Sequence, residues 1–419
     1  MNDYLVGIDI GSSKICAAVG RFNKNGELAI LGVTSVACRG LKKAVVVDID
    51  NSAESIRECV KKLERMVDIE IKEAYISLPG GISELVHNTG IVAISSEDRE
   101  IRKSDVDRVL EAAKLISVSS DKEIIGIEPQ QFIIDGYDNI KDPVGMSGLR
   151  LEVEAEVLVA QTTIVNNLIK SVNKAGIEVN GICLQPKATA KVVLMQEERE
   201  MGVALVDVGA EIIDVTVIKN DNVCFTSIIP LGGNSITNDI SLGLKIPLSE
   251  AEKFKIKYAN LLDNSINSEK DDFNIKSSYN EEITVNYNFL REIIEARVEE
   301  LITLTRNQII KSGHFEEITD VVFVGGGISS IKGVIDLSKS ILKKPVRIGS
   351  PKYVGAANPI YAAAVGIVKD ASDIFKQGEA LGNYHEETEN DSIWNQSNKK
   401  SYENTSVLSK VRNFLADFF

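Results

Sequence analysis

Two segments of the chain, about 200 residues apart, carry the same pattern of hydrophobic and polar positions. Tyr4–Gly20 and Val203–Val223 each contain an apolar strand, then Asp-x-Gly, a short polar turn and a second apolar strand. Paired apolar strands around a glycine-bearing polar turn are typical of a β-hairpin, and here each turn also carries a carboxylate. We therefore expect a duplicated α/β architecture with one such hairpin in each half.

Two further segments place apolar residues at helical spacing. One follows Ser104, which is the predicted N-cap of its helix. Its apolar positions are Val106, Val109, Leu110 and Ala113. The other segment, 288–313, predicts a long helix that a lysine and a glycine end.

Two polar segments interrupt these patterns. Residues 263–282 predict a surface loop. Residues 383–405 have too few apolar positions to pack and predict a disordered linker, which as a random coil would span on the order of 25 Å.

The segment 406–419 has the pattern of an amphipathic helix. On a helical wheel its apolar side chains fall within an arc of roughly 140°. These side chains are Val407, Leu408, Val411, Phe414, Leu415, Phe418 and Phe419. A helix that follows a disordered linker favours an interfacial membrane helix, with Lys410 and Arg412 at the lipid headgroups. A helix for a partner's groove and a core-packing helix are the alternatives.

Composition narrows the possible functions. The 419 residues are 44% apolar, which supplies a large core in two or more domains. A formal net charge of −14 leaves no basic field for nucleic acid and restricts any membrane contact to a local element. The scattered cysteines and histidines predict neither disulfides nor a zinc site. We expect a cytoplasmic protein, because the chain has no signal-peptide pattern and no apolar run of about 18 residues.

The turn of the first hairpin carries groups suited to a phosphate chain and its cation. Asp9, at a strand end, can hold Mg²⁺ through water ligands. Gly11 lets the backbone approach a phosphate. Ser12 and Ser13 offer N–H and hydroxyl donors, and Lys14 neutralises charge. A tight hairpin with incidental polar residues is the alternative.

A triple glycine, Gly325–Gly327, between an apolar strand and a helix permits close approach of a nucleoside to the backbone. A βα turn that needs positive φ explains the glycines alone equally well. Together with the two hairpins, in this order, they resemble the actin-like ATPases, which clamp ATP between two halves. Within that superfamily, the sequences "EIRKSDVDRVLEAAK", "LGGNSITNDISLGL" and "NPIYAAAVGIV" resemble the bacterial division family FtsA. Asp142–Glu154, "DPVGMSGLRLEVE", resembles the subdomain inserted in that family.

The resemblance implies a duplicated, two-lobed α/β fold of the actin-like (ribonuclease-H-like) class, with an FtsA-type inserted subdomain and a C-terminal amphipathic helix. It also implies a division of the chain, in which segments that are apart in sequence share a lobe. The expected parts are 1–80 with 161–199 and 357–382 (first lobe), 81–160 (inserted subdomain), 200–232 with 306–356 (second-lobe core), 233–305 (second-lobe outer subdomain), 383–405 (linker) and 406–419 (membrane-targeting helix).

Nucleotide-binding residues are carried over from the family position by position. They are Asp9, Gly11, Ser12, Ser13 and Lys14 on the first loop, Asp207 and Gly209 on the second, Lys255 near the base, and Gly325, Gly326 and Gly327 at the nucleoside. Asp9 and Asp207 would hold Mg²⁺ through water. Glu252, Glu295 and Arg297 are weaker candidates, whose alternative is a solvated helix face.

The second loop departs from the family's pattern Asp-x-Gly-Gly-Gly-Thr-x-Asp. Ala210 and Glu211 replace glycines, and Ile212 replaces the threonine, so the hydroxyl donor is lost. A Glu211 carboxylate about 4 Å from a phosphate charge would cost about 4 kcal/mol at an effective dielectric constant of about 20. Either Glu211 points away or joins the Mg²⁺ shell and ATP binding is modest, or nucleotide use has been lost.

Gln185 is the candidate catalytic residue, at a position where the family tends to have a carboxylate or a similar polar residue. An amide can orient a water molecule but cannot act as a general base, so we expect slow ATP hydrolysis or none. A polar residue before a proline turn is the alternative.

The function that the resemblance implies is a scaffold that binds ATP, self-assembles into an actin-like filament and tethers FtsZ filaments to the cytoplasmic face of the membrane at the division septum. The implied partners are FtsZ at 233–305, further copies of the chain through the inserted subdomain, membrane lipids and later division proteins. A pilus-assembly-type actin-like adaptor and a nucleotide-free FtsA-like membrane scaffold are the alternatives. For a kinase the chain offers no evident catalytic carboxylate, and for a chaperone no further substrate domain.

Overall fold

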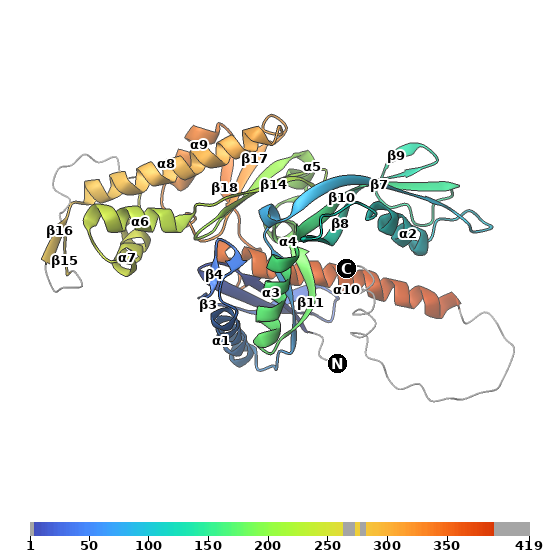
Figure 1. Ribbon diagram of the computed structural model, residues 1–419, viewed down its shortest axis with the longest axis horizontal. Coiled ribbons are helices and arrows are strands. Elements are labelled where there is room, and N and C mark those ends of the chain that lie inside the picture. The colour runs from blue at the N-terminus through green and yellow to red at the C-terminus, as the bar shows by residue number, and fades with distance from the viewer. Residues whose placement is uncertain (1–3, 263–272, 277–281, 389–419) are drawn as a thin grey trace.

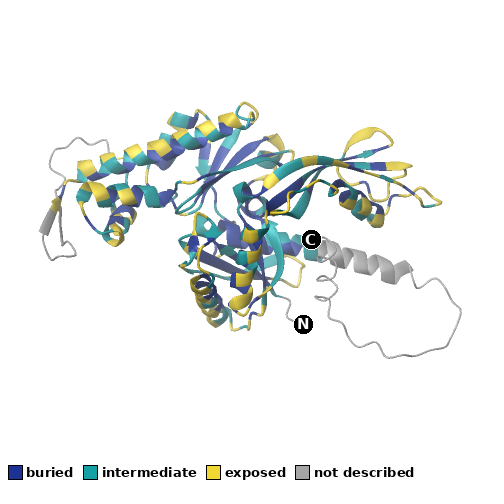
Figure 2. Ribbon diagram, viewed as in Figure 1, coloured by how far each residue is buried: buried dark blue, intermediate teal, exposed yellow. Residues whose placement is uncertain are grey.

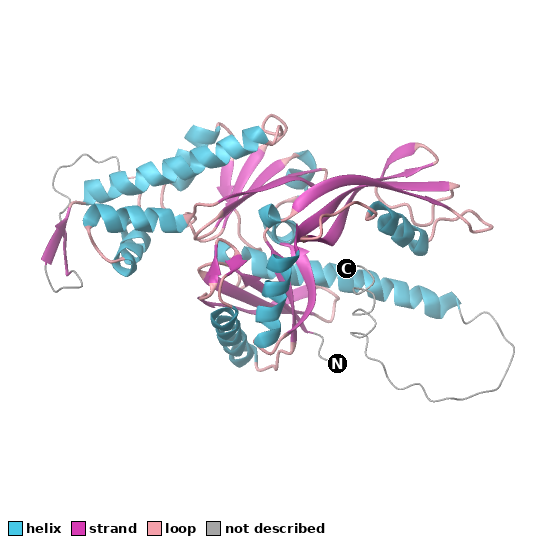
Figure 3. Cartoon of the chain, in the orientation of Figure 1, coloured by secondary structure: helices cyan, strands magenta, loops and turns pink. Residues whose placement is uncertain are grey.

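The structure is a computed structural model that describes residues 4–262, 273–276 and 282–388. Two lobes and an inserted subdomain make up the molecule (Figure 1). Each lobe combines a sheet with helices, and the inserted subdomain is mainly sheet (Figure 3). Buried residues gather where helices meet sheets, and exposed residues cover the outer helix faces (Figure 2).

The first lobe is built on a five-stranded sheet in the order β11-β6-β1-β2-β3. β1 and β2 form the predicted antiparallel hairpin, and β6 runs parallel to β1. Both strands of the hairpin are apolar along most of their length, because the sheet is covered on both faces. The strands are β1 (Tyr4–Ile10), β2 (Lys14–Phe22), β3 (Leu28–Ala37), β6 (Glu73–Leu78) and β11 (Glu178–Leu184).

Helices cover both faces of this sheet. Asp48 caps the N-terminus of α1 by accepting the Asn51 N–H at 2.9 Å, and the helix ends at Asp68 in the left-handed conformation. One face carries α1 (Ile49–Val67) and α3 (Thr162–Lys174), and the other carries α4 (Gln185–Val193) and α10 (Ala362–Thr388).

The second lobe repeats the sheet of the first in the order β14-β13-β12-β17-β18. In both sheets, three antiparallel strands are continued on one side by two parallel strands. The predicted duplication is therefore confirmed at the level of strand order. The elements are β12 (Val203–Val208), β13 (Ile213–Lys219), β14 (Asn222–Ile229), β17 (Asp320–Val324) and β18 (Val346–Ile348), with α5 (Gln196–Met201), α8 (Tyr287–Lys311) and α9 (Val334–Leu342).

One hydrophobic core joins the lobes. It contains Cys16 and Ala18 from the first sheet, Leu205 and Val322 from the second, and residues of α4 and α10. These two helices therefore form the floor of the space between the lobes. The predicted long helix is α8, which ends before Gly313, a glycine with φ of +80°.

The inserted subdomain has a four-stranded sheet in the order β7-β10-β8-β9, with α2 packed on it. Its elements are β7 (Glu84–Ala93), α2 (Lys103–Ala113), β8 (Lys122–Ile134), β9 (Tyr137–Ile140) and β10 (Arg150–Gln161). α2 lies directly against β7, because a Cβ at Gly90 would come within 2.1 Å of the Val109 carbonyl oxygen. Only glycine allows this approach without a shift of the backbone.

The predicted N-cap at Ser104 is wrong, because α2 begins at Lys103 with Arg102 as its N-cap. The Asp105 carboxylate accepts the Arg102 backbone N–H at 2.9 Å. This bond gives the N–H group at the start of α2 an acceptor from the first turn of the same helix. The Ser104 hydroxyl is not used for the cap.

The outer part of the second lobe contains α6 (Gly233–Leu244), α7 (Leu248–Tyr258) and a short two-stranded sheet. This sheet pairs β15 (Phe273–Lys276) with β16 (Glu282–Val285). The prediction of an uninterrupted loop over 263–282 is therefore wrong in part. The alternation of apolar and polar residues in "FNIK" is a strand signal that the surrounding polar residues obscured.

The last described element, α10, runs to Thr388. Residues 383–388 of the predicted linker therefore belong to a helix. The rest of the linker, and the amphipathic segment 406–419 with its seven predicted membrane-binding residues, lie outside the described residues. Among the described residues, no helix is both long and apolar enough to cross a membrane.

Candidate nucleotide-binding cleft

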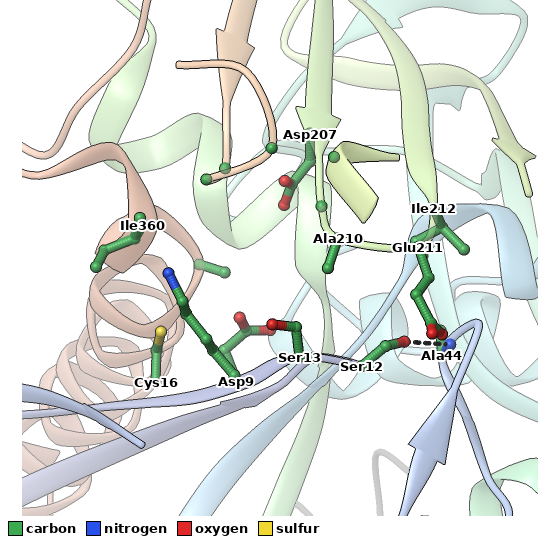
Figure 4. A pocket seen from close by; sticks show the side chains of 18 of the residues that line it. Asp9, Ser12, Ser13, Cys16, Ala44, Asp207, Ala210, Glu211, Ile212 and Ile360 are labelled. Carbon is green, nitrogen blue, oxygen red and sulfur yellow. Dashed lines mark hydrogen bonds between the residues drawn. The ribbon is translucent and has the colours of Figure 1, made fainter. Parts of the chain in front are cut away.

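A cleft between the lobes collects most of the residues that the sequence singled out. It is formed by the turns of both hairpins, the start of α4, the turn after β17 and the 3-10 helix η2 (Pro359–Tyr361) (Figure 4). The sequence-predicted residues that line it are Asp9, Gly11, Ser12, Ser13, Lys14, Gln185, Asp207, Gly209, Glu252, Lys255, Gly325, Gly326 and Gly327.

Two of the weaker candidates lie elsewhere. Arg297 and Glu295 are on α8 and do not line the cleft. Arg297 pairs with Asp239 and Glu300, and Glu295 lies 3.6 Å from Arg291. Arg297 therefore links α8 to α6, and the Glu295–Arg291 pair lies on α8 itself, so both residues serve the helices and not the cleft.

The two hairpin turns have the same backbone structure. The Gly11 N–H donates to the Lys14 carbonyl at 3.0 Å, and the Gly209 N–H donates to the Ile212 carbonyl at 2.9 Å. A Cβ on either glycine would stand 3.0 or 3.1 Å from that carbonyl oxygen. The equivalence also pairs Asp9 with Asp207, Ser12 with Ala210 and Ser13 with Glu211. The first turn therefore carries two hydroxyl donors, whose equivalents in the second turn are an alanine and a carboxylate.

Asp9 and Asp207 face each other across the cleft (Figure 4). Burial and, to a lesser degree, the charge of Asp207 raise the pKa of Asp9 to about 7, against a hydrogen bond from the Ser77 hydroxyl at 3.0 Å. Burial raises the pKa of Asp207 to about 6, against a 2.7 Å bond from the Gln185 amide. A divalent cation between these carboxylates would relieve their repulsion.

The donor set fits Mg²⁺ held mostly by water. No cluster of three or more potential metal-ligating side chains occurs in the part of the chain that the structure describes. Mg²⁺ usually takes one or two carboxylates and fills its remaining positions with water and phosphate oxygens. Asp9 and Asp207 can supply the carboxylates of such a site.

The charge of the cleft makes a cation necessary for a polyphosphate. The acidic residues that line it are Asp9, Asp207, Glu211, Asp214 and Glu252, and the basic ones are Lys14 and Lys255. Lys255 is 8% exposed and pairs with Glu252 at 2.7 Å, so Lys14 carries most of the remaining positive charge. A bare polyphosphate would meet an excess of negative charge here.

Gln185 is the first residue of α4 and is 5% exposed. Its amide nitrogen donates to Asp207 Oδ2 at 2.7 Å and to Thr189 Oγ1 at 3.4 Å. Both amide N–H groups have partners, so the carbonyl oxygen is the atom left to orient a water molecule. This geometry supports an orienting role for the residue and excludes a proton-accepting one.

Asp214 is a residue of the cleft that sequence reasoning missed. It pairs with Asp207 in the hairpin register, and burial raises its pKa to about 6. The Gly81 N–H and the Thr216 hydroxyl each donate to it at 3.0 Å. Gly81 lies in η1 (Gly80–Ile82), where the chain enters the inserted subdomain. The signal in the sequence was the last residue of "DVGAEIID", an aspartate where the family's pattern also ends on an aspartate.

The triple glycine forms a close backbone contact with the second hairpin. Gly325 has φ of +83°, and a Cβ there would stand 2.2 Å from Asp207 Oδ1. A Cβ on Gly327 would stand 2.5 Å from the Gly209 carbonyl oxygen. Gly326 is less crowded, with Ile360 as the nearest side chain at 3.2 Å. Two glycines are therefore needed for packing, and Gly326 borders the open cleft.

Glu211 makes a contact that the sequence could not reveal. Its Oε2 accepts the Lys43 N–H at 2.6 Å, at the tip of a hairpin formed by β4 (Leu41–Lys42) and β5 (Val45–Val46). The adjacent Ala44 N–H donates to Ser12 Oγ at 2.9 Å (Figure 4). Glu211 therefore lines the cleft with its carboxylate engaged by the opposite lobe.

The tip of this hairpin is strained. Lys43 and Ala44 have φ of +47° and +65°, which is the left-handed region at two consecutive positions. Non-glycine residues pay about 1–2 kcal/mol each for this conformation. The bonds from Glu211 and Ser12 offset part of that cost.

The sequence of the chain matches two protein-family models and several known proteins. The family model "Cell division protein FtsA" matches residues 204–366, and "SHS2 domain inserted in FTSA" matches residues 80–159. The cell division protein FtsA of Bacillus subtilis (strain 168) is 38% identical over 386 residues, which cover 91% of this chain and 86% of that protein. FtsA of Pseudomonas aeruginosa is 33% identical over 369 residues, which cover 87% and 88%.

Solved structures support the fold class. The PilM-PilN type IV pilus biogenesis complex has a TM-score of 0.59 and 15% identity, with 88% of this chain and 98% of the other covered. Ethanolamine utilization protein EutJ of Carboxydothermus hydrogenoformans has a TM-score of 0.52 and 16% identity, with 87% and 89% covered. At these identities the likeness shows the fold alone. The actin-like, two-lobed α/β fold with an inserted subdomain is confirmed.

Proposed function

The chain belongs to the FtsA family of cell division proteins, and on this premise we propose that it binds Mg–ATP in the interlobe cleft, assembles with its own copies and tethers FtsZ filaments to the cytoplasmic face of the membrane. An actin-like division scaffold is what the family itself establishes. Nucleotide, FtsZ and membrane binding are the specific activities that the proposal adds.

The nucleotide part of the proposal rests on one observation. Three elements of the kind that bind a phosphate chain or a nucleoside line the same cleft. Two equivalent hairpin turns line the cleft, and the glycine turn after β17 closes one wall. Lys14 is exposed at the first turn, and its amine reaches to 3.9 Å from the position of a Cβ at Gly326. A phosphate chain with its Mg²⁺ would match the charges of Lys14, Asp9 and Asp207.

Titration calorimetry of the full chain with ATP and Mg²⁺ tests this part. We expect micromolar binding that disappears when Mg²⁺ is removed, because the cleft carries more acidic than basic groups. Lys14→Ala should weaken binding about tenfold or more, the usual loss for a charge-assisted hydrogen bond. Lys61→Ala removes an exposed lysine from α1 of the same lobe and should leave binding unchanged.

Two results would contradict the nucleotide part. No binding at millimolar Mg–ATP would favour the nucleotide-free scaffold, in which the cleft is retained only for its structure. Equal losses for Lys14→Ala and Lys61→Ala would mean that the phosphate chain lies elsewhere.

The membrane and FtsZ parts rest on sequence and family. The segment 406–419 carries seven apolar side chains on one side of a helical wheel. The FtsZ-binding region would be the outer subdomain at 233–305, with the inserted subdomain at a contact between copies. Turnover of ATP would be slow, because Gln185 can orient water but cannot accept its proton.

A further inference from the structure

The Glu211–Lys43 hydrogen bond joins the two lobes across the cleft. Glu211 belongs to the second lobe and Lys43 to the first, 168 residues earlier in the chain. Ile360, next to α10, lies on one side of the view in Figure 4, and the contact of Glu211 with the hairpin tip lies on the other. The lobes are thus joined by α4 and α10 at the floor and by hydrogen bonds between the two sides, which include Gln185–Asp207, Gly81–Asp214 and this one.

We propose that Glu211 is an interlobe clasp. By this we mean a positioning residue that holds the lobes closed over bound nucleotide through its hydrogen bond to the tip of the β4–β5 hairpin. The inference deepens the nucleotide function proposed above and rests on it. It also gives a role to a residue for which the sequence predicted either repulsion of a phosphate, a position turned away from it, or a place in the Mg²⁺ shell.

The tip is suited to this role because the first phosphate turn already holds it. Ser12 Oγ accepts the Ala44 N–H at 2.9 Å, and its own hydroxyl proton remains available to a phosphate oxygen in the cleft. One continuous series of contacts then runs from the phosphate through Ser12 and the hairpin tip to Glu211. A nucleotide that orders Ser12 would therefore favour the closed position of the clasp.

Residue-resolved amide hydrogen exchange of the full chain tests the clasp without nucleotide. In Glu211→Ala, we expect the Lys43 amide to exchange about tenfold faster or more, because its charged acceptor is gone. The Ala44 amide should change less than about twofold, because Ser12 lies in the same lobe. Unchanged exchange at Lys43 would overturn the clasp. Equal acceleration at both amides would also overturn it, because Glu211 would then merely order the tip.

The release of a fluorescent ATP analogue with Mg²⁺, followed by stopped flow, tests the coupling to nucleotide. The decisive comparison is Glu211→Ala with Glu211→Gln, because both variants lack the charge and only glutamine can still accept the Lys43 N–H. We expect release from Glu211→Ala to be about tenfold faster than from Glu211→Gln. Glu197→Ala, an exposed carboxylate on α5, should match the unaltered chain.

The possible outcomes distinguish a failure of the clasp from a failure of the proposed nucleotide function. Equal release rates for the alanine and glutamine variants would overturn the clasp, even if both differ from the unaltered chain through charge. If the unaltered chain binds no Mg–ATP, the proposed nucleotide function fails, and the amide-exchange experiment still decides whether Glu211 joins the lobes.

Discussion

Asp9 and Asp207 hold equivalent positions in the two hairpins, and their surroundings give them different acidities. Asp9 is half-buried, faces a second carboxylate and has a pKa of about 7, whereas Asp207 has the Gln185 amide as a partner and a pKa of about 6. Near neutral pH, Asp9 therefore holds a proton part of the time when no cation is bound. Binding of Mg²⁺ would displace that proton.

The raised pKa of Asp9 predicts a dependence of stability on pH. Its folded pKa lies above the unfolded value of 3.8, so its contribution is fully present below about pH 4 and is lost as pH rises through about 7. Asp9→Asn removes this dependence and keeps an acceptor for Ser77. Without nucleotide or Mg²⁺, we expect Asp9→Asn to gain up to about 4 kcal/mol over the unaltered chain between pH 4 and 8.

Melting temperatures of both proteins across that pH range measure the effect. Saturating Mg–ATP is the control, because the bound cation should remove most of the advantage of the variant. A difference between the two proteins that stays constant from pH 4 to 8 would contradict a raised pKa at Asp9.

At the scale of single residues, some positions in the cleft could be predicted from the sequence and some contacts could not. Asp9 and Lys14 could be assigned because their neighbours in the chain complete a phosphate turn. The partner of Glu211 could not be assigned, because Lys43 is 168 residues away and contributes only its backbone. Asp214 was visible in the motif, but its bond to Gly81 depends on the path of the chain into the inserted subdomain.

At the scale of elements, the hairpins followed from the sequence because their apolar runs and turn residues lie together in the chain. Helix ends were harder to predict. The start of α2 is set by the Asp105 carboxylate, which competes with the serine before it for the capping role. The strand β15 was hidden by polar neighbours and needs β16 as its partner.

The packing of α2 on β7 makes a testable prediction. Gly90→Ala places a Cβ 2.1 Å from the Val109 carbonyl oxygen, so we expect the inserted subdomain to lose about 1–3 kcal/mol of stability. Hydrogen exchange of the α2 amides in the full chain measures this local loss, as about tenfold to hundredfold faster exchange.

Gly126→Ala is the matched control on β8 of the same sheet. A Cβ there meets only Leu158 Cδ1, at 4.0 Å, so α2 should exchange as in the unaltered chain or slightly more slowly. Comparable acceleration in both variants would mean that any added methyl group weakens this sheet, and the close contact at Gly90 would not be the cause.

At the scale of the whole molecule, the net charge of −14 and the proposed membrane helix at 406–419 would act in opposite senses at a membrane. Anionic lipid would repel the acidic body, whereas seven apolar side chains, if half buried in lipid at ~1 kcal/mol each, would give ~7 kcal/mol of attraction before ordering costs. One copy should bind weakly and reversibly. An assembly presents many tails at once and should bind stably.

Vesicle flotation tests the tail. Phe414→Glu with Phe418→Glu should release the full chain from vesicles of mixed zwitterionic and anionic lipid, because two apolar anchors become charged. The double variant Ser409→Glu with Asn413→Glu adds the same charge on the polar side of the wheel and should weaken binding much less. Retained flotation of the phenylalanine variant would exclude the tail as the anchor.

The inserted subdomain emerges from the chain of the first lobe, yet its hydrogen bonds reach the second. Gly81 at its root donates to Asp214, and the Asn222 side chain of β14 donates to the Gln130 carbonyl of β8 at 3.1 Å. The inserted subdomain therefore bridges the two lobes, because the chain connects it to the first and hydrogen bonds connect it to the second. Any change in the angle between the lobes would have to bend the subdomain or move its far end. A small rotation at the cleft would then produce a larger displacement of the β8–β9 hairpin tip.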